Sequence, residues 1–90
     1  MQYEWDENKR IANIVKHSVD FTSAVDFLWV NACITRDTRK CYSEDRYMAT
    51  SFIGNRLFLM VFTLRGETVR IISLRKANKR EEKNHENKTS

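Results

Sequence analysis

The sequence predicts one small α+β domain, in which two N-terminal helices pack on a small antiparallel β-sheet and a basic helix ends the chain. Apolar residues recur at helical spacing in the first third, β-branched and aromatic residues dominate the middle, and the last residues are charged or polar. The chain has 90 residues, 41% of them hydrophobic, which suffices for one thin core but not for two. We therefore expect residues 1–90 to form a single domain, with about 78–90 as a tail that frays.

The chain is expected to begin with a short strand and a first helix. Gln2–Trp5 is interpreted as a short edge strand, and Asp6 follows it as the N-cap of the helix. Apolar residues then fall at positions i, i+3 and i+4, namely Ile11, Ile14 and Val15. This helix should end near His17-Ser18.

A second helix is expected directly afterwards, with Asp20 as its N-cap. The apolar residues that follow are spaced i, i+3, i+4 and i+7, as one helical stripe requires: Phe21, Ala24, Val25 and Leu28. Two amphipathic helices are therefore predicted before the strands.

Strands are expected to fill the middle of the chain. Four segments have strand character: Ala32–Arg36, Arg46–Ile53, Leu57–Leu64 and Glu67–Leu74. Gly54-Asn55 and Arg65-Gly66 supply residues that tolerate positive φ, so the last three segments are predicted to form an antiparallel meander. Its middle strand is apolar at nearly every position, which indicates burial on both faces.

The basic charge is concentrated in the second half of the chain. Met1–Asp45 holds 6 Lys and Arg against 8 Asp and Glu, whereas Arg46–Ser90 holds 10 against 4, so the halves carry −2 and +6 and sum to +4. Such a concentration attracts a polyanion, with Arg favoured for planar contacts to phosphate. The alternative is a solvated face that only keeps the protein in solution.

The composition excludes several classes of protein. No apolar run approaches the roughly 18 residues of a membrane span, and Met1–Arg10 contains no hydrophobic signal core. Cys33 and Cys41 are too few for a disulfide scaffold and lack CxxC spacing, and His17 and His85 add too little for a zinc site. We expect a cytoplasmic protein that contacts no membrane and needs no metal or cofactor.

Four stretches of the sequence form a recognisable series of motifs, namely Trp5–Lys9, Asn13–Phe21, Glu44–Arg46 and Arg70–Ala77. In their order, and over nearly the whole chain, they resemble the BrnT family, the toxin half of a bacterial type II toxin–antitoxin pair. Two features depart from the family pattern. Ser18 stands where the family usually has a helix-ending glycine, and Asn84–Ser90 lacks the usual aromatic ending.

The resemblance implies a RelE-like fold and a metal-independent endoribonuclease that cleaves RNA and inhibits translation. It also implies neutralisation by a BrnA-like antitoxin, with two toxins on an antitoxin dimer, so that operator DNA is contacted only through the antitoxin. These expectations come from the likeness and not from periodicity or charge.

Metal-free cleavage of RNA requires a base for the 2′-OH proton, cations for the transition state and an acid for the leaving 5′-oxygen. His17 is the first candidate base, because its ordinary pKa is about 6.5 and it lies at a predicted helix end. The alternative is a histidine that only caps helix-end carbonyls. Glu44 is ranked second, since beside Asp45 and Arg46 it also fits a surface ion pair.

Arg70 and Arg75 complete the predicted catalytic set. Strict strand alternation puts Val69, Ile71, Ser73 and Arg75 on one face, and Arg70, Ile72 and Leu74 on the other. Arg70 lies between β-branched residues, where a half-buried guanidinium needs either a structural carboxylate or a substrate phosphate. We favour the phosphate.

The remaining candidates are predicted to contact RNA: Lys16, Arg46, Tyr47, Lys76 and Arg80. For Lys16, Lys76 and Arg80 the alternative is a solvated helix surface. Among the aromatic residues, Tyr42 and Tyr47 are the preferred platforms for stacked bases, whereas Trp5 and Trp29 adjoin apolar stripes and are expected in the core.

A second class of function stays open, namely a non-catalytic basic module that binds nucleic acid or a protein partner. Both classes predict RNA binding that weakens with salt. Cleavage of RNA in the presence of EDTA separates them.

Overall fold

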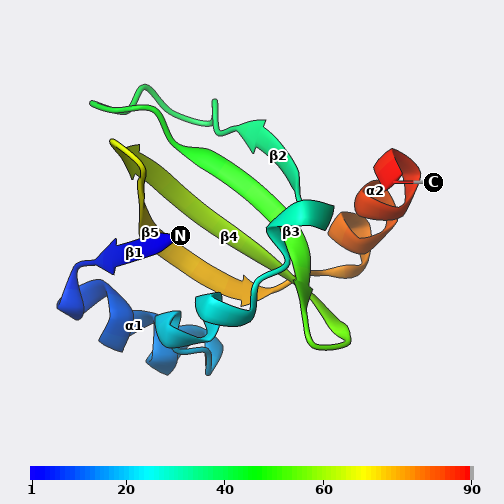
Figure 1. Ribbon diagram of the computed structural model, residues 1–90, viewed down its shortest axis with the longest axis horizontal. Coiled ribbons are helices and arrows are strands. Elements are labelled where there is room, and N and C mark those ends of the chain that lie inside the picture. Colours follow the sequence, from blue (N-terminus) through cyan, green and yellow to red (C-terminus); the bar gives the residue numbers. More distant parts are fainter. Residues whose placement is uncertain (90) are drawn as a thin grey trace.

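The fold is built on one five-stranded mixed sheet, and its α+β class agrees with the prediction (Figure 1). The computed structural model describes residues 1–89. The strands lie in the order β1-β5-β4-β3-β2. Their bounds are Gln2–Trp5 for β1, Cys33–Arg36 for β2, Tyr47–Ile53 for β3, Arg56–Arg65 for β4 and Thr68–Lys76 for β5. The helices are α1 (Glu7–His17) and α2 (Lys79–Thr89), with 3₁₀ turns η1 (Phe21–Asp26) and η2 (Trp29–Asn31).

The prediction of an antiparallel sheet was wrong at one edge, because β1 runs parallel to β5. The β3–β4–β5 meander has the expected antiparallel pairing, which leaves the outer edge of β5 without a partner. The first strand of the chain fills that edge. Its parallel direction needs a long crossover, which α1, the 3₁₀ turns and the other strands supply.

Helix α1 forms as predicted but buries a different face. Asp6 caps it by accepting hydrogen bonds from the backbone N–H groups of Asn8 and Lys9, at 2.8 and 3.2 Å. Its buried residue is Asn13, whereas Ile11 and Val15 are 51% and 82% exposed. The Asn13 amide packs on β5 and bonds both the N–H and the C=O of Leu74, so hydrogen bonding rather than an apolar stripe fixes this helix.

The predicted second α-helix is a 3₁₀ turn, η1, and this correction has a simple geometric reason. Phe21, Ala24 and Phe27 are buried and lie three residues apart, which matches the three residues per turn of a 3₁₀ helix. Val25, which the α-helical stripe would bury, is 77% exposed. The Asp20 cap is confirmed, since its side chain accepts from Thr22 N at 3.0 Å.

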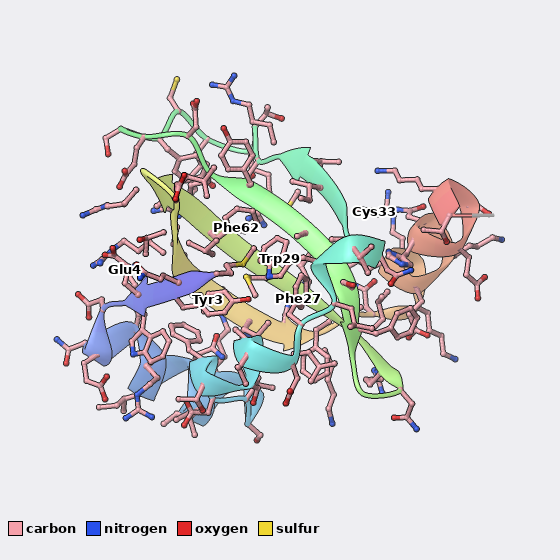
Figure 2. All side chains as sticks on the ribbon, viewed as in Figure 1. Tyr3, Glu4, Phe27, Trp29, Cys33 and Phe62 are labelled. Atoms are coloured by element: carbon pink, nitrogen blue, oxygen red, sulfur yellow. The ribbon has the colours of Figure 1, made fainter. Side chains whose placement is uncertain are left out.

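An aromatic cluster joins these turns to one face of the sheet, called here the core face. Figure 2 labels four of its members, Tyr3, Phe27, Trp29 and Phe62. Trp29 packs edge-on against Phe27 and Phe62, with ring centroids 4.8 and 5.4 Å apart, and its indole N–H donates to Tyr3 Oη at 2.6 Å. Trp29 therefore belongs to the core, as the sequence indicated.

A β-bulge in β5 changes which side chains share a face. Phe62 pairs with Ile71 and Val61 pairs with Ser73, so Ile72 is an extra residue and the alternation reverses there. The predicted grouping of Arg75 with Ile71 was therefore wrong, because Leu74 takes the place on the core face. Arg70 and Arg75 both lie on the opposite face, called here the second face.

Helix α2 packs over the second face beside β2 and β3 (Figure 1). It contains no apolar residue, and its buried residue is His85, which is 5% exposed. The His85 ring shares a hydrogen bond of 2.9 Å with Thr50 Oγ1 and stands edge-on to Phe52. The other end of this face is flanked by the loop of residues 37–46, which Thr63 of β4 contacts.

Candidate functional site

A basic cleft of about 390 Å³ lies on the second face, where the loop of residues 37–46 meets β4 and β5. We call it the arginine cleft. Its charged lining consists of Lys9, Glu44, Arg46, Arg65 and Arg70, and Tyr42 and Thr63 also line it. Four cations and one carboxylate from four separate parts of the chain thus converge on one small space.

Arg70 lies on β5, directly opposite Glu4 of the parallel strand β1. The register brings the two side chains to the same face, and Arg70 Nη1 donates to Glu4 Oε2. The structural carboxylate that the sequence left as an alternative is therefore present. The side chain of Arg70 is still 28% exposed, and within residues 1–89 its other guanidinium nitrogens make no hydrogen bond. Arg70 can bind Glu4 and an anion at the same time, because its planar guanidinium has five N–H donors.

Arg46 is positioned by an aromatic ring. Its guanidinium carbon lies 4.2 Å from the centroid of the Tyr42 ring, a cation–π contact. No carboxylate comes within ion-pair distance of Arg46 in the described part of the chain. Its positive charge is therefore available to a ligand in the arginine cleft.

The loop that carries Arg46 is organised around Asp37, which is 3% exposed. Arg39 forms two hydrogen bonds to this carboxylate, at 2.8 and 2.7 Å, and Tyr42 Oη donates to it at 3.1 Å. Hydrogen bonds from Arg39 hold the pKa of Asp37 well below its usual range, although burial opposes ionisation. Thr63 Oγ1 also donates to the backbone carbonyl of Asp45 at 2.7 Å, which ties the loop to β4.

Glu44 is the one carboxylate that lines the arginine cleft. Its side chain is 47% exposed and its Oε1 accepts from Arg65 Nη2 at 3.2 Å. Such a long, half-exposed ion pair is weak. An anion that binds Arg65 can therefore separate the pair without a large cost, which leaves the Glu44 carboxylate free to accept a proton.

The other two predicted catalytic residues lie elsewhere. His17 ends α1 and does not line the arginine cleft; burial lowers its pKa, and the charges of Lys16 and Arg75 lower it further. Arg75 forms a two-pronged ion pair with Glu81 of α2, with both N–O distances at 2.8 Å. The structure thus brings Glu44 and Arg70 into one cleft and leaves His17 and Arg75 outside it.

The predicted RNA contacts are also divided. Arg46 lines the arginine cleft, whereas Tyr47 is on the core face, with its ring 5.6 Å from that of Phe62. Lys16 and Lys76 are exposed at the ends of α1 and β5, and Arg80 is exposed on α2.

Sequence reasoning missed Lys9 and Arg65 as members of the cleft. Arg65 had a usable signal, because strand alternation places it on the same face as Thr63. Lys9 had none, since its role depends on where α1 starts relative to β5.

Within residues 1–89, no three His, Cys, Asp or Glu side chains gather closely enough to hold a metal ion. Neither of the described helices has the length and apolar character needed to cross a membrane.

A family model described as a ribonuclease toxin, BrnT, of a type II toxin–antitoxin system matches residues 5–81. The match covers most of the chain and contains every residue that lines the arginine cleft. This chain belongs to the BrnT family. Among curated proteins, none matches the chain. As a BrnT toxin of a type II system, the protein has an antitoxin as its partner. The matched region ends at Glu81, so the rest of α2 lies outside the family pattern.

Proposed function

We propose that this BrnT toxin cleaves RNA in the arginine cleft by a metal-independent reaction. The main observation in support is that Glu44 lines the arginine cleft together with Arg46, Arg65 and Arg70. The carboxylate accepts the proton of a ribose 2′-OH, and the 2′-oxygen attacks the adjacent phosphorus. The bond from phosphorus to the 5′-oxygen breaks, and the leaving oxygen takes a proton from water. The products are a 2′,3′-cyclic phosphate and a 5′-hydroxyl end.

The arginines stabilise the charge that develops on the phosphate oxygens during this step. Arg46 and Arg70 supply donors that the protein leaves free, and Lys9 adds a further positive charge at the rim. Substrate binding also frees the Glu44 carboxylate to act as the base, because a phosphate that binds Arg65 breaks the ion pair between Arg65 and Glu44. The geometry therefore favours Glu44 over His17 as the general base.

His17 remains the second candidate base and has one observation in its favour. Its lowered pKa favours the neutral imidazole, which is the form that a base needs. Lys16 and Arg75 are the cations that influence it, and the Arg75 guanidinium is already held by Glu81. A site at His17 would therefore need the pair of Arg75 and Glu81 to open.

Substitution of each base in the full-length toxin, freed of antitoxin and assayed on RNA in EDTA, tests the proposal. Glu44→Gln should lower kcat at least about 100-fold, in the range of general-base catalysis. His17→Gln should change it less than about threefold. The matched control is Glu86→Gln, an exposed carboxylate on α2. The reverse order of effects would move the active site to His17.

The assay also decides between the two function classes. Cleavage in EDTA with a cyclic phosphate product supports the metal-independent ribonuclease. RNA that is bound but stays intact in every buffer would make the chain a non-catalytic binding module, and cleavage only after addition of a divalent metal would reject the proposed chemistry.

We further propose that cleavage inhibits translation in the cytoplasm and that a BrnA-like antitoxin neutralises it, with two toxins on an antitoxin dimer. Operator DNA would then be contacted only through the antitoxin. The expectation is that the purified toxin stops protein synthesis in a cell-free translation reaction, and that Glu44→Gln does not. Continued synthesis with the active toxin would contradict this role.

A further inference from the structure

A second cavity, of about 520 Å³, lies between α2 and strands β2, β3 and β4. We call it the α2 pocket. Figure 2 labels Cys33, one of its lining residues, on the side of the sheet next to α2. Leu59 and Met48 give it an apolar floor, and a volume of this size is in the usual range for a small-molecule site. The α2 pocket and the arginine cleft share no lining residue.

Among the polar side chains that line the α2 pocket, three come from one side of α2, namely Arg80, Asn84 and Lys88. They are spaced i, i+4 and i+8, so they form one stripe along α2, about 6 Å apart. Within residues 1–89 none of the three side chains makes a hydrogen bond or an ion pair. The neighbouring stripe is occupied, because Glu81 holds Arg75 and His85 holds Thr50. One stripe of α2 therefore anchors the helix, and the other is free for a ligand.

The chemistry of the free stripe fits a nucleotide. An asparagine amide can donate and accept on the edge of one base. The cations one helical turn away on either side, Arg80 and Lys88, suit the phosphates that flank such a base. The apolar floor of Leu59 and Met48 suits the flat face of a nucleobase. A solvated helix face would offer the same cations but would not have a cavity of this volume beneath them.

The position of the α2 pocket relates it to the arginine cleft. Thr63 lines the cleft and Leu59 lines the pocket, and both belong to the second face of β4. Four residues of a strand span about 13 Å. A short stretch of single-stranded RNA can bridge that distance along the second face.

We infer that the α2 pocket binds one nucleobase of the RNA substrate, close to the scissile phosphate in the arginine cleft, and that Asn84 reads its edge. This inference rests on the proposed function, which it deepens by giving the toxin a base-specific subsite. The subsite would set which RNA sequences are cut, while the arginine cleft supplies the chemistry.

The test uses AMP, GMP, CMP and UMP as probes, since none of them can be cleaved. Each is titrated into the isotope-labelled full chain, and NMR shifts are followed at Asn84 and Leu59. One or two of the four nucleotides should shift both residues. Asn84→Ala should weaken that binding at least about fivefold, the lower end for a lost base contact. The matched control is Asn87→Ala, an exposed asparagine on α2 that does not line the pocket.

A second readout is the sequence around the cut in a random RNA pool. Asn84→Ala should remove the preference for one base near the cut, whereas Asn87→Ala should keep that preference. Nucleotide-induced shifts confined to the arginine cleft, or equal effects of the two asparagine variants, would overturn the subsite.

Failure of the subsite differs from failure of the proposed function. If Glu44→Gln abolishes cleavage while no nucleotide reaches Asn84, the subsite is wrong and the active site stands. If nucleotides bind at Asn84 but Glu44→Gln cleaves normally, the active site is wrong and the subsite stands.

Discussion

At the scale of single residues, Arg70 serves both the fold and the proposed chemistry. It holds Glu4 across the β1–β5 pair and also lines the arginine cleft. We expect Arg70→Ala to reduce cleavage at least about tenfold through loss of a transition-state contact. The measurement is kcat on RNA, together with urea unfolding to show that the variant is folded.

The control for Arg70 is Glu4→Gln, which removes the ion pair but leaves the guanidinium. This variant should cleave at close to the normal rate, because Arg70 keeps its place in the cleft. Equal losses of activity in the two variants would mean that Arg70 acts only by holding the strands together.

Asn13 is the residue on which the docking of α1 depends. Its amide is 6% exposed and bonds Val19 O at 2.9 Å, Leu74 O at 2.7 Å and Leu74 N at 3.2 Å. Asn13→Ala leaves these buried backbone groups without partners, so we expect it to lower the free energy of unfolding by about 2–4 kcal/mol. Urea denaturation measures this, and Asn8→Ala, an exposed change on α1, should stay within about 0.5 kcal/mol. A loss below about 1 kcal/mol for Asn13→Ala would show that α1 docks by other contacts.

At the scale of elements, the attachment of α2 depends on the ionised state of Glu81. Burial opposes ionisation of this carboxyl, but the hydrogen bonds from Arg75 and from the backbone of Asn78 outweigh it, so its pKa is lowered. A carboxyl with a lowered pKa stabilises the fold above its ordinary pKa of 4.5 and loses that effect as pH falls through the folded value.

We therefore expect Glu81→Gln to be less stable than the unmodified toxin by about 1–2 kcal/mol at pH 7, as for a half-buried two-pronged pair. The difference should shrink as pH falls below 4.5. Urea unfolding across that pH range measures it, and Glu86→Gln should show no such trend. A difference that stays constant with pH would mean that the ion pair does not hold α2.

The strands and α1 were predictable, and the errors had local physical causes. The capping residues Asp6 and Asp20 and the turns at Gly54 and Gly66 act over a few residues, so the sequence displays them directly. The type of helix after Asp20 was not predictable in that way. It is decided by whether Val25 or Phe27 is buried, and the larger aromatic side chain takes the place in the core.

The candidate site was predictable only in part. Glu44 and Arg70 carried recognisable chemistry, but their meeting in one cleft depends on the packing of the loop of residues 37–46 against β4 and β5, which is a long-range feature. The bulge at Ile72 turned Arg75 toward α2, where Glu81 holds it. Strict alternation along β5 contains no signal for that reversal.

At the scale of the whole molecule, the arginine cleft and the α2 pocket open on one face. An antitoxin that blocks RNA binding must cover that face. Acidic side chains of the antitoxin would complement the positive charge of its Arg and Lys residues. We expect complex formation to protect the backbone amides of Arg46–Arg75 from hydrogen exchange more than those of α1. Exchange followed by mass spectrometry measures this.

Protection confined to residues 6–28 would contradict that arrangement. The result would be informative, because Val15 and Val25 are 82% and 77% exposed and offer an apolar surface on the other side of the sheet. The antitoxin would then act at a distance from the cleft.

The parallel pairing of β1 with β5 also affects how the toxin folds during its synthesis. Gln2–Trp5 is synthesised first, yet its partner Thr68–Ile71 follows more than sixty residues later, and a chain grows from its N-terminus on the ribosome. The edge of the sheet, the Glu4–Arg70 pair and the cleft beside it are therefore missing from every unfinished chain. A nascent BrnT toxin thus cannot assemble its arginine cleft until β5 has been synthesised and has left the ribosome.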